Sequence, residues 1–244
     1  PQPQVISGGG EPLTIAVAQD AAFGFYYADD LDALQATGAQ LVFFDALKDP
    51  RLPACDGLFI GGGFPESFLD ELEANATLRS EILDAIEGGL PAYAECGGLM
   101  YLARSIEWQG KTRRMVGAIG GRVVMHAKPV GRGYVVLQPT AEHPWRTGND
   151  ETVPTLKAHE FHYSSIEDLP VDTQYAYTIN RGHGIDGKRD GIVHKNLLAS
   201  YTHLRATAGC DWPAKFVNFV RSVRHSAHDT SHQPSGQEIK PCSN

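Results

Sequence analysis

The sequence predicts an α/β protein built on a parallel β-sheet. Short apolar runs typical of buried strands alternate with segments of helical spacing through about the first hundred residues. Glycine-rich turns follow two of these runs, at residues 61–63 and 97–98. Because ligands bind beyond the carboxyl ends of the strands in such sheets, both turns are candidate parts of a functional site.

The first half of the chain supplies the predicted parallel strands, which are residues 13–18, 41–44, 57–60 and 90–94. After the first strand, residues 19–27 form a loop. Asp29 and Asp30 are then placed to cap a helix that ends at Gly38. Helices are also predicted over residues 67–72, 78–86 and 98–104.

The second half is richer in strands, which are predicted over residues 115–125, 133–138, 175–179 and 197–201, with a turn-rich connector at 182–191. Phe216, Phe219 and Val220 have helical spacing and predict a closing helix over 212–223. One domain is therefore expected over residues 13–224. It lies between a linker at 1–12, whose start without methionine indicates a piece of a longer or processed chain, and a disordered polar tail at 225–244.

Composition narrows the class of protein. The 244 residues include 42% hydrophobic and 20% charged residues, as in a soluble globular protein, and the formal net charge is −8. No basic patch indicates nucleic-acid binding, and no apolar run approaches the ~20 residues that span a bilayer. The four cysteines (Cys55, Cys96, Cys210 and Cys242) have no metal-ligand spacing, which favours a reducing compartment such as the cytoplasm.

Cys96 is the candidate nucleophile. It lies between the predicted strand 90–94 and the helix that starts at Gly98, in a turn too short for a relaxed loop. A strand that breaks sharply into a helix raises the turn residue above the sheet, as in the nucleophile elbow. The partial positive charge of the helix N-terminus favours the thiolate. The alternative is a buried cysteine that packs as a small hydrophobic residue.

A cysteine nucleophile needs a base, and histidine is the usual one at neutral pH. His203 follows the strand 197–201, so it is expected at the same sheet edge as Cys96; it could equally hold a loop. His159 and His162 are the rivals, and their aromatic neighbours suit a substrate-contact or structural role at least as well. With Glu160 they fit no common zinc motif, so no metal site is predicted.

The glycine run at 61–63 is not a P-loop, because no Gly-Lys-Ser/Thr sequence follows it. Its backbone N–H groups could form an oxyanion hole with that of Gly97, and a single such donor is worth about 3 kcal/mol of barrier. The alternative is a tight turn between strand and helix.

Five segments occur in an order that resembles the C-terminal glutamine amidotransferase domain of cobyrinic acid a,c-diamide synthases. They are QDAAFGFYY (19–27), LFIGGGFPE (58–66), AECGGLMYL (94–102), HEFHYS (159–164) and SYTH (200–203). The resemblance covers about residues 13–223. It implies a class I glutamine amidotransferase fold, a flavodoxin-like three-layer αβα sandwich.

The resemblance also implies site residues. Cys96 would attack the glutamine carboxamide, form a thioester and release ammonia, with His203 as base and Gly62, Gly63 and Gly97 lining the oxyanion site. Many class I enzymes carry a glutamate two residues after the histidine, but here that residue is Arg205. The related corrin enzymes also lack it, so a Cys–His dyad is expected. Ala94 likewise replaces the first glycine of the common Gly-x-Cys-x-Gly elbow.

The resemblance implies an N-terminal domain that uses ATP and Mg²⁺ to activate a tetrapyrrole carboxylate, for which this chain has neither a P-loop nor room. The chain itself is expected to need no cofactor and to hydrolyse glutamine. Candidate contacts to that domain or to the corrin are Phe23, Tyr26, Tyr27, His159 and His162; ordinary aromatic packing is the alternative. Two other functions stay open: amidation of another tetrapyrrole such as sirohaem, and a non-catalytic interaction module.

Overall fold

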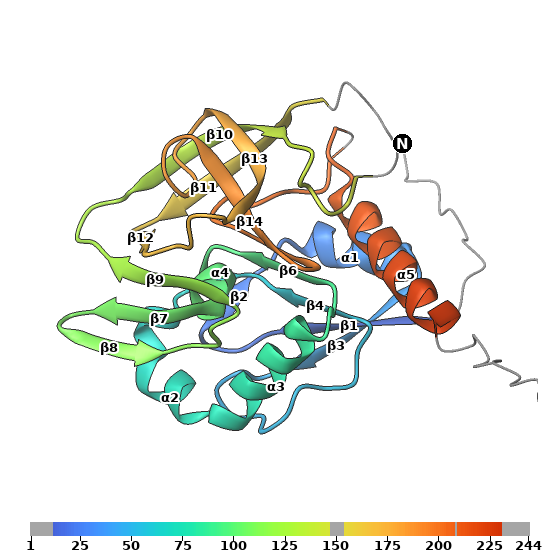
Figure 1. Ribbon diagram of the computed structural model, residues 1–244, viewed down its shortest axis with the longest axis horizontal. Coiled ribbons are helices and arrows are strands. Elements are labelled where there is room, and N and C mark those ends of the chain that lie inside the picture. Colours follow the sequence, from blue (N-terminus) through green and yellow to red (C-terminus); the bar gives the residue numbers. More distant parts are fainter. Residues whose placement is uncertain (1–11, 147–153, 208, 231–244) are drawn as a thin grey trace, which may run out of the picture.

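The computed structural model describes residues 12–146, 154–207 and 209–230, which are built around a nine-stranded sheet (Figure 1). Five neighbouring strands are parallel: β1 (Leu13–Ala18), β3 (Ala39–Phe44), β4 (Gly57–Ile60), β6 (Ala92–Glu95) and β15 (Leu197–Ser200). Numbered along the chain, they lie in the spatial order 2-1-3-4-5, which is the flavodoxin-like order. The predicted parallel α/β sheet is confirmed.

The antiparallel part of the same sheet extends from β15. It contains β14 (Arg189–His194), β13 (Gln174–Arg181), β10 (Gly131–Pro139) and β11 (Leu156–His162). A second sheet contains β12 (Ser164–Glu167), β9 (Ile119–Met125), β7 (Ala103–Trp108) and β8 (Lys111–Arg114). A third, very short sheet pairs β2 (Phe23–Phe25) with β5 (Gly62–Gly63). The strand β15 thus joins the parallel and antiparallel parts of the main sheet.

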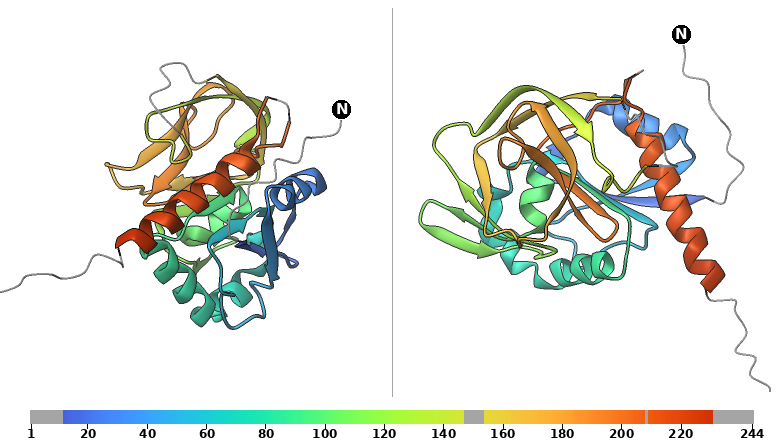
Figure 2. Two further views of the ribbon diagram at one scale, coloured as in Figure 1. Left: turned by 90° about the vertical axis from the view of Figure 1, so that its right-hand side faces the viewer. Right: turned by 45° about the horizontal axis from the view of Figure 1, so that its top comes forward.

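Helices cover both faces of the parallel strands. On one face, α1 (Ala28–Ala36) and α5 (Trp212–Thr230) contact each other, and Leu34 and Phe216 join a core with Ile15 of β1. Figure 2 shows α5 running along this side of the sheet. The other face carries a 3₁₀ turn (Pro65–Phe68), α2 (Leu69–Ala74), α3 (Ala76–Glu87) and α4 (Gly97–Leu102). There Ala16 of β1 shares a core with Ile82 of α3, so the three layers αβα are present as predicted.

Several boundaries differ from the prediction. The helix after Cys96 ends at Leu102 rather than at residue 104, because Ala103 is extended and begins β7, whose Ile106 enters the core. The loop 19–27 contains β2, the connector 182–191 contains the start of β14, and the strand predicted from residue 115 begins at Ile119. Tyr27, not Asp29 or Asp30, is at the N-cap of α1.

The prediction of a disordered tail from residue 225 is wrong for its first residues. Helix α5 continues to Thr230. Within this extension, the side chains of His225 and Ser226 form hydrogen bonds to the carbonyl oxygens of Arg221 and Ser222, one turn earlier. Residues 231–244 of the predicted tail and 1–11 of the predicted linker lie outside the described residues. None of the helices in the described ranges has the length and apolarity that crossing a lipid bilayer requires.

Candidate active site

Cys96 occupies a strained turn at the carboxyl end of β6. It is the N-cap residue of α4, and its φ of 47° and ψ of −98° are unusual for a residue with a side chain. Such strain costs about 1–3 kcal/mol and persists only where surrounding contacts hold it. The N–H of Cys96 donates to Ser200 O at 2.7 Å, and its carbonyl accepts from the N–H of Met100 at 3.0 Å. The predicted elbow is present, and Cys96 is 7% exposed.

The glycines after Cys96 are required by close packing of the backbone. A Cβ on Gly98 would lie 2.1 Å from Ile60 O, and a Cβ on Gly97 would lie 2.8 Å from Gly63 N. The turn at 61–63 and the start of α4 therefore pack directly against each other. Gly97 is the first residue of α4, and the first N–H groups of a helix have no partner within the helix.

His203 lies at the same sheet edge because β15 is the neighbour of β6. Its backbone pairs with that of His159, with His203 N–H donating to His159 O at 2.8 Å, and the two imidazole rings stack at 5.0 Å. Cys96 and His203 line one cavity of about 310 Å³. The structure thus brings the predicted nucleophile and the predicted base together.

Glu95 also lies next to His203, although the sequence did not lead us to predict it as a site residue. Its Oε2 lies 3.4 Å from Nδ1 of His203, and its side chain is 5% exposed. Burial alone would lower the pKa of His203, but hydrogen bonding to Cys96 and Glu95 outweighs burial and raises that pKa to about 10. The available signal was a charged residue that ends an otherwise apolar strand directly before the candidate nucleophile.

Gly62 and Gly63, the predicted oxyanion-site glycines, form β5 rather than a plain turn. A Cβ on Gly62 would lie 2.7 Å from Cε1 of His203, and one on Gly63 would lie 1.8 Å from Ala22 O. A side chain at Gly63 would overlap the backbone, and one at Gly62 would displace the ring of His203. Gly63 also lines the cavity that Cys96 and His203 share.

A second cavity, of about 330 Å³, is also lined by Cys96. Phe64 and Phe161 line both cavities, and the Sγ of Cys96 lies 3.8 Å from Phe161 O. Glu66 lines the second cavity, and burial raises the pKa of its carboxyl group. No group of three His, Cys, Asp or Glu side chains is placed to hold a metal ion in the part of the chain that the structure describes.

Of the predicted contact residues, Tyr27 and His159 lie at the first cavity. Tyr27 OH is 3.2 Å from Nε2 of His159, and the guanidinium of Arg205 covers the Tyr27 ring at 4.8 Å. Tyr26 also lines this cavity, but its hydroxyl is held by the backbone, donating to Ala18 O and accepting from Gly61 N–H.

Phe23 is a correction to the predicted contact set, because it is 0% exposed and packs on Tyr101 within the core. His162 is 3% exposed and stacks on Tyr201 at 3.9 Å, and it borders the second cavity beside Cys96. The exposed aromatic side chains near the two cavities are Phe25, Phe64, Phe161 and Tyr163.

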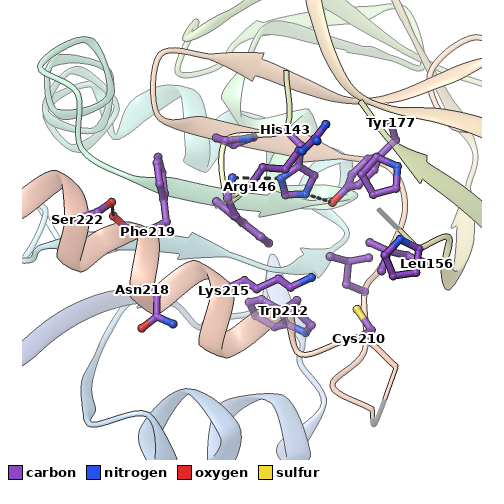
Figure 3. A pocket seen from close by; sticks show the side chains of 15 residues that line it. His143, Arg146, Leu156, Tyr177, Cys210, Trp212, Lys215, Asn218, Phe219 and Ser222 are labelled. Carbon is purple, nitrogen blue, oxygen red and sulfur yellow. Dashed lines mark hydrogen bonds between the residues drawn. The ribbon is translucent and has the colours of Figure 1, made fainter. Parts of the chain in front are cut away.

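A third pocket, of about 400 Å³, lies beside α5 and contains neither Cys96 nor His203 (Figure 3). His143 lies in it between the N–H of Trp145 and the hydroxyl of Tyr177, at 3.1 and 3.0 Å. Burial, with a smaller effect from Lys215, lowers the pKa of His143 to about 4. This histidine is therefore neutral in the fold and serves the packing of this face.

Comparison with known proteins identifies the family of the chain. The model of the CobB/CobQ-like glutamine amidotransferase domain matches residues 14–209. The chain belongs to this family. In solved structures, the fold is similar to PurLQS from Thermotoga maritima (TM-score 0.62, 15% identity, 87% of this chain and 99% of that chain). It is also similar to a glutamine amidotransferase from the same organism (TM-score 0.54, 12% identity, 91% and 86%).

Curated relatives share more of the sequence. The chain is 41% identical over 213 residues to the cobyrinate a,c-diamide synthase of Magnetococcus marinus, which covers 87% of this chain and 45% of that protein. It is 42% identical over 236 residues to the same enzyme of Methanosarcina acetivorans, covering 90% and 46%. The chain therefore spans about half the length of the curated relatives it matches.

Proposed function

We propose that this chain hydrolyses glutamine with Cys96 as nucleophile and His203 as base, and that the ammonia serves a synthase half that amidates corrin carboxylates in cobalamin biosynthesis. The observation that carries the proposal is the strained elbow at Cys96, which shares a cavity with His203. The acceptor is supported by the relatives, which are named cobyrinate a,c-diamide synthase.

The reaction begins when the Cys96 thiol gives its proton to His203. The sulfur then attacks the carboxamide carbon, and the carbonyl oxygen becomes an oxyanion beside the backbone of Gly62, Gly63 and Gly97. One well-placed N–H donor stabilises such an intermediate by about 3–4 kcal/mol. His203 returns the proton to the departing nitrogen, which leaves as ammonia, and a glutamyl thioester remains. Water, deprotonated by His203, hydrolyses the thioester to glutamate and restores the thiol.

The second cavity is the proposed site for the amino-acid end of glutamine. Glu66 lines it beside Cys96, and a carboxylate there offers a partner for the α-ammonium group. Burial disfavours the charged form of the Glu66 carboxyl group. A bound ammonium group would replace the stabilisation that water gives to an exposed carboxylate.

The proposed partner is the synthase half, which would carry ATP and Mg²⁺ and activate the tetrapyrrole carboxylate as an acyl phosphate for attack by ammonia. Phe25, Phe64 and Phe161 are 56%, 51% and 49% exposed at the cavities around Cys96, which supports contact of that half with this face. Tyr27 and His159 border the same opening. Since the described cysteines, Cys96 included, form no disulfide, the cytoplasm is the proposed compartment.

The test is covalent labelling of Cys96 by a glutamine analogue that carries a diazo ketone in place of the carboxamide. Mass spectrometry should find the label on Cys96, and Cys96→Ser should remove it together with ammonia release from glutamine. Cys55→Ser is the matched control, because Cys55 is a half-buried free cysteine that lines neither of the two cavities at Cys96. A folded wild-type chain that takes no label on Cys96 contradicts the proposal.

A further inference from the structure

Glu95 is a buried carboxylate whose position follows from strand geometry. Successive residues of a strand point to opposite faces, so Glu95 shares a face with Tyr93 rather than with Ala94. This face of β6 packs toward α5, where Tyr93 joins the core with Trp212 and Leu204. Glu95 therefore projects toward the chain that follows β15, while the next residue, Cys96, turns into the elbow.

The two carboxylate oxygens of Glu95 have different partners. Oε1 accepts a hydrogen bond from Tyr93 OH at 2.5 Å and another from the N–H of Leu204 at 2.9 Å. Oε2 faces Nδ1 of His203 at 3.4 Å. A buried carboxylate with charge-assisted bonds on both oxygens is held in one orientation. Glu95 thus holds both the ring of His203 and the backbone of the residue after it.

No other carboxylate forms a salt bridge with His203 among the residues that the structure describes. The residue two positions after His203 is Arg205, which lies 3.1 Å from Asp29 and covers the Tyr27 ring. Asp30 accepts from Ala206 N–H instead. The loop after His203 is therefore attached to α1 through these side chains, and the acid next to the imidazole comes from β6.

We infer that Glu95 is the positioning residue for His203, so that the site is a Glu–His–Cys triad in which the acid directly precedes the nucleophile. The inference rests on the proposed function for its catalytic meaning. The Glu95 carboxylate accepts Nδ1–H of the imidazole, which fixes the tautomer and leaves Nε2 unprotonated for the Cys96 thiol. Hydrogen bonds of this kind are often long in unliganded sites and tighten with substrate.

The transfer of the proton from Cys96 to His203 conserves both protons and charge. The thiol proton moves from Sγ of Cys96 to Nε2 of His203, while Nδ1–H stays on the ring and Glu95 stays ionised. The imidazolium then lies between a thiolate and a carboxylate, two negative groups that stabilise it. The raised pKa of His203 has this cause. Without Glu95 the ring loses one of these two partners and its fixed tautomer.

The decisive variant is Glu95→Gln, which keeps the shape of the side chain. Its carbonyl oxygen can still accept from Tyr93 and Leu204, so the fold is retained, and its NH₂ group then faces Nδ1 of His203. A donor at that place requires an unprotonated Nδ1, which moves the ring proton to Nε2 and blocks the thiol. We expect kcat for glutamine hydrolysis to fall roughly 10²–10⁴-fold with KM changed less than about threefold.

Two readouts do not depend on glutamine turnover. NMR titration of His203 should show its pKa lowered by about one unit or more in Glu95→Gln, and ¹⁵N shifts should show the proton moved to Nε2. Alkylation of Cys96 by iodoacetamide at pH 7 should slow about tenfold or more. Glu160→Gln is the matched control, since Glu160 is also buried and lies 3.6 Å from Nε2 of another histidine, His162. It should leave His203 and the alkylation of Cys96 unchanged.

The outcomes separate the two claims. If the wild type releases no ammonia and takes no glutamine-analogue label, yet Glu95→Gln changes the His203 titration and the alkylation rate as expected, the proposed function fails and the positioning role stands. If Glu95→Gln folds and keeps kcat, the His203 pKa and the tautomer of the wild type, the positioning role is overturned while the glutaminase proposal is untouched. Equal effects of Glu160→Gln would also overturn it.

Discussion

The contact between Gly62 and His203 gives a prediction that follows directly from geometry. In Gly62→Ala the new Cβ would lie 2.7 Å from Cε1 of His203 and 3.2 Å from Cβ of Phe25. Ordinary contacts begin near 3.4 Å, so the imidazole must move by about 0.7 Å or more. Gly62 has no positive φ, so the substitution adds crowding without backbone strain. Overpacking of this kind costs about 1–3 kcal/mol of stability.

The expected effect on activity is larger than the effect on folding. A misplacement of about 1 Å at a catalytic group can cost ~10²-fold in rate, so a shift of His203 by most of that distance should lower kcat about 10–100-fold. The assays are ammonia release from glutamine and the rate of Cys96 labelling, with thermal unfolding measured in parallel. The control is Gly24→Ala on neighbouring β2, where the nearest atom to a Cβ is 3.6 Å away. A Gly62→Ala protein with wild-type kcat would show that His203 is not held against the glycine turn.

Three further predictions concern pH, substrate and partner. His143 is neutral in the fold and its pKa of about 4 lies below the ordinary 6.5, so the unfolded chain takes up its proton first as pH falls. The free energy of unfolding should therefore fall by up to about 3 kcal/mol between pH 6.5 and pH 4 because of this group. His143→Gln should reduce that pH dependence in urea unfolding, and an unchanged pH dependence would show that His143 is not held neutral in the fold. Glu66→Gln should raise KM for glutamine about tenfold with a smaller change in kcat, whereas an unchanged KM would move the amino-acid end out of the second cavity. Phe64→Ala should weaken binding of the synthase half about tenfold in titration calorimetry and leave unfolding nearly unchanged, because the side chain is 51% exposed; equal binding would exclude this rim from the interface.

Local patterns were sufficient for the first half of the fold. The apolar runs and glycine turns predicted the four parallel strands of this half and the elbow at Cys96, because each of these features is encoded by adjacent residues. Boundaries failed where distant partners decide them. Ala103 begins a strand because β9 pairs with it, and the end of α4 therefore depends on residues that come later in the chain.

The candidate site shows the same difference between features set by adjacent residues and features set by distant ones. Cys96 and His203 were predicted from their places after two strands, and the structure brings them to one cavity. Glu95 was missed because its role depends on which face of β6 it occupies and on the neighbouring β15, and neither is written in the local sequence. Phe23 was assigned wrongly for a related reason. The local sequence does not distinguish an aromatic residue of an exposed loop from one of a short buried strand, and Phe23 is buried because it packs on the distant Tyr101.

The pairing of β6 with β15 has a consequence for when the thiol becomes reactive. Cys96 N–H donates to Ser200 O, and His203 follows three residues later, so both the shape of the elbow and its base depend on a strand made near the end of the chain. A nascent chain that has folded only as far as α4 has the cysteine but neither its base nor this hydrogen bond. Under the proposed function, completion of the sheet is therefore the step that brings Cys96 and His203 together.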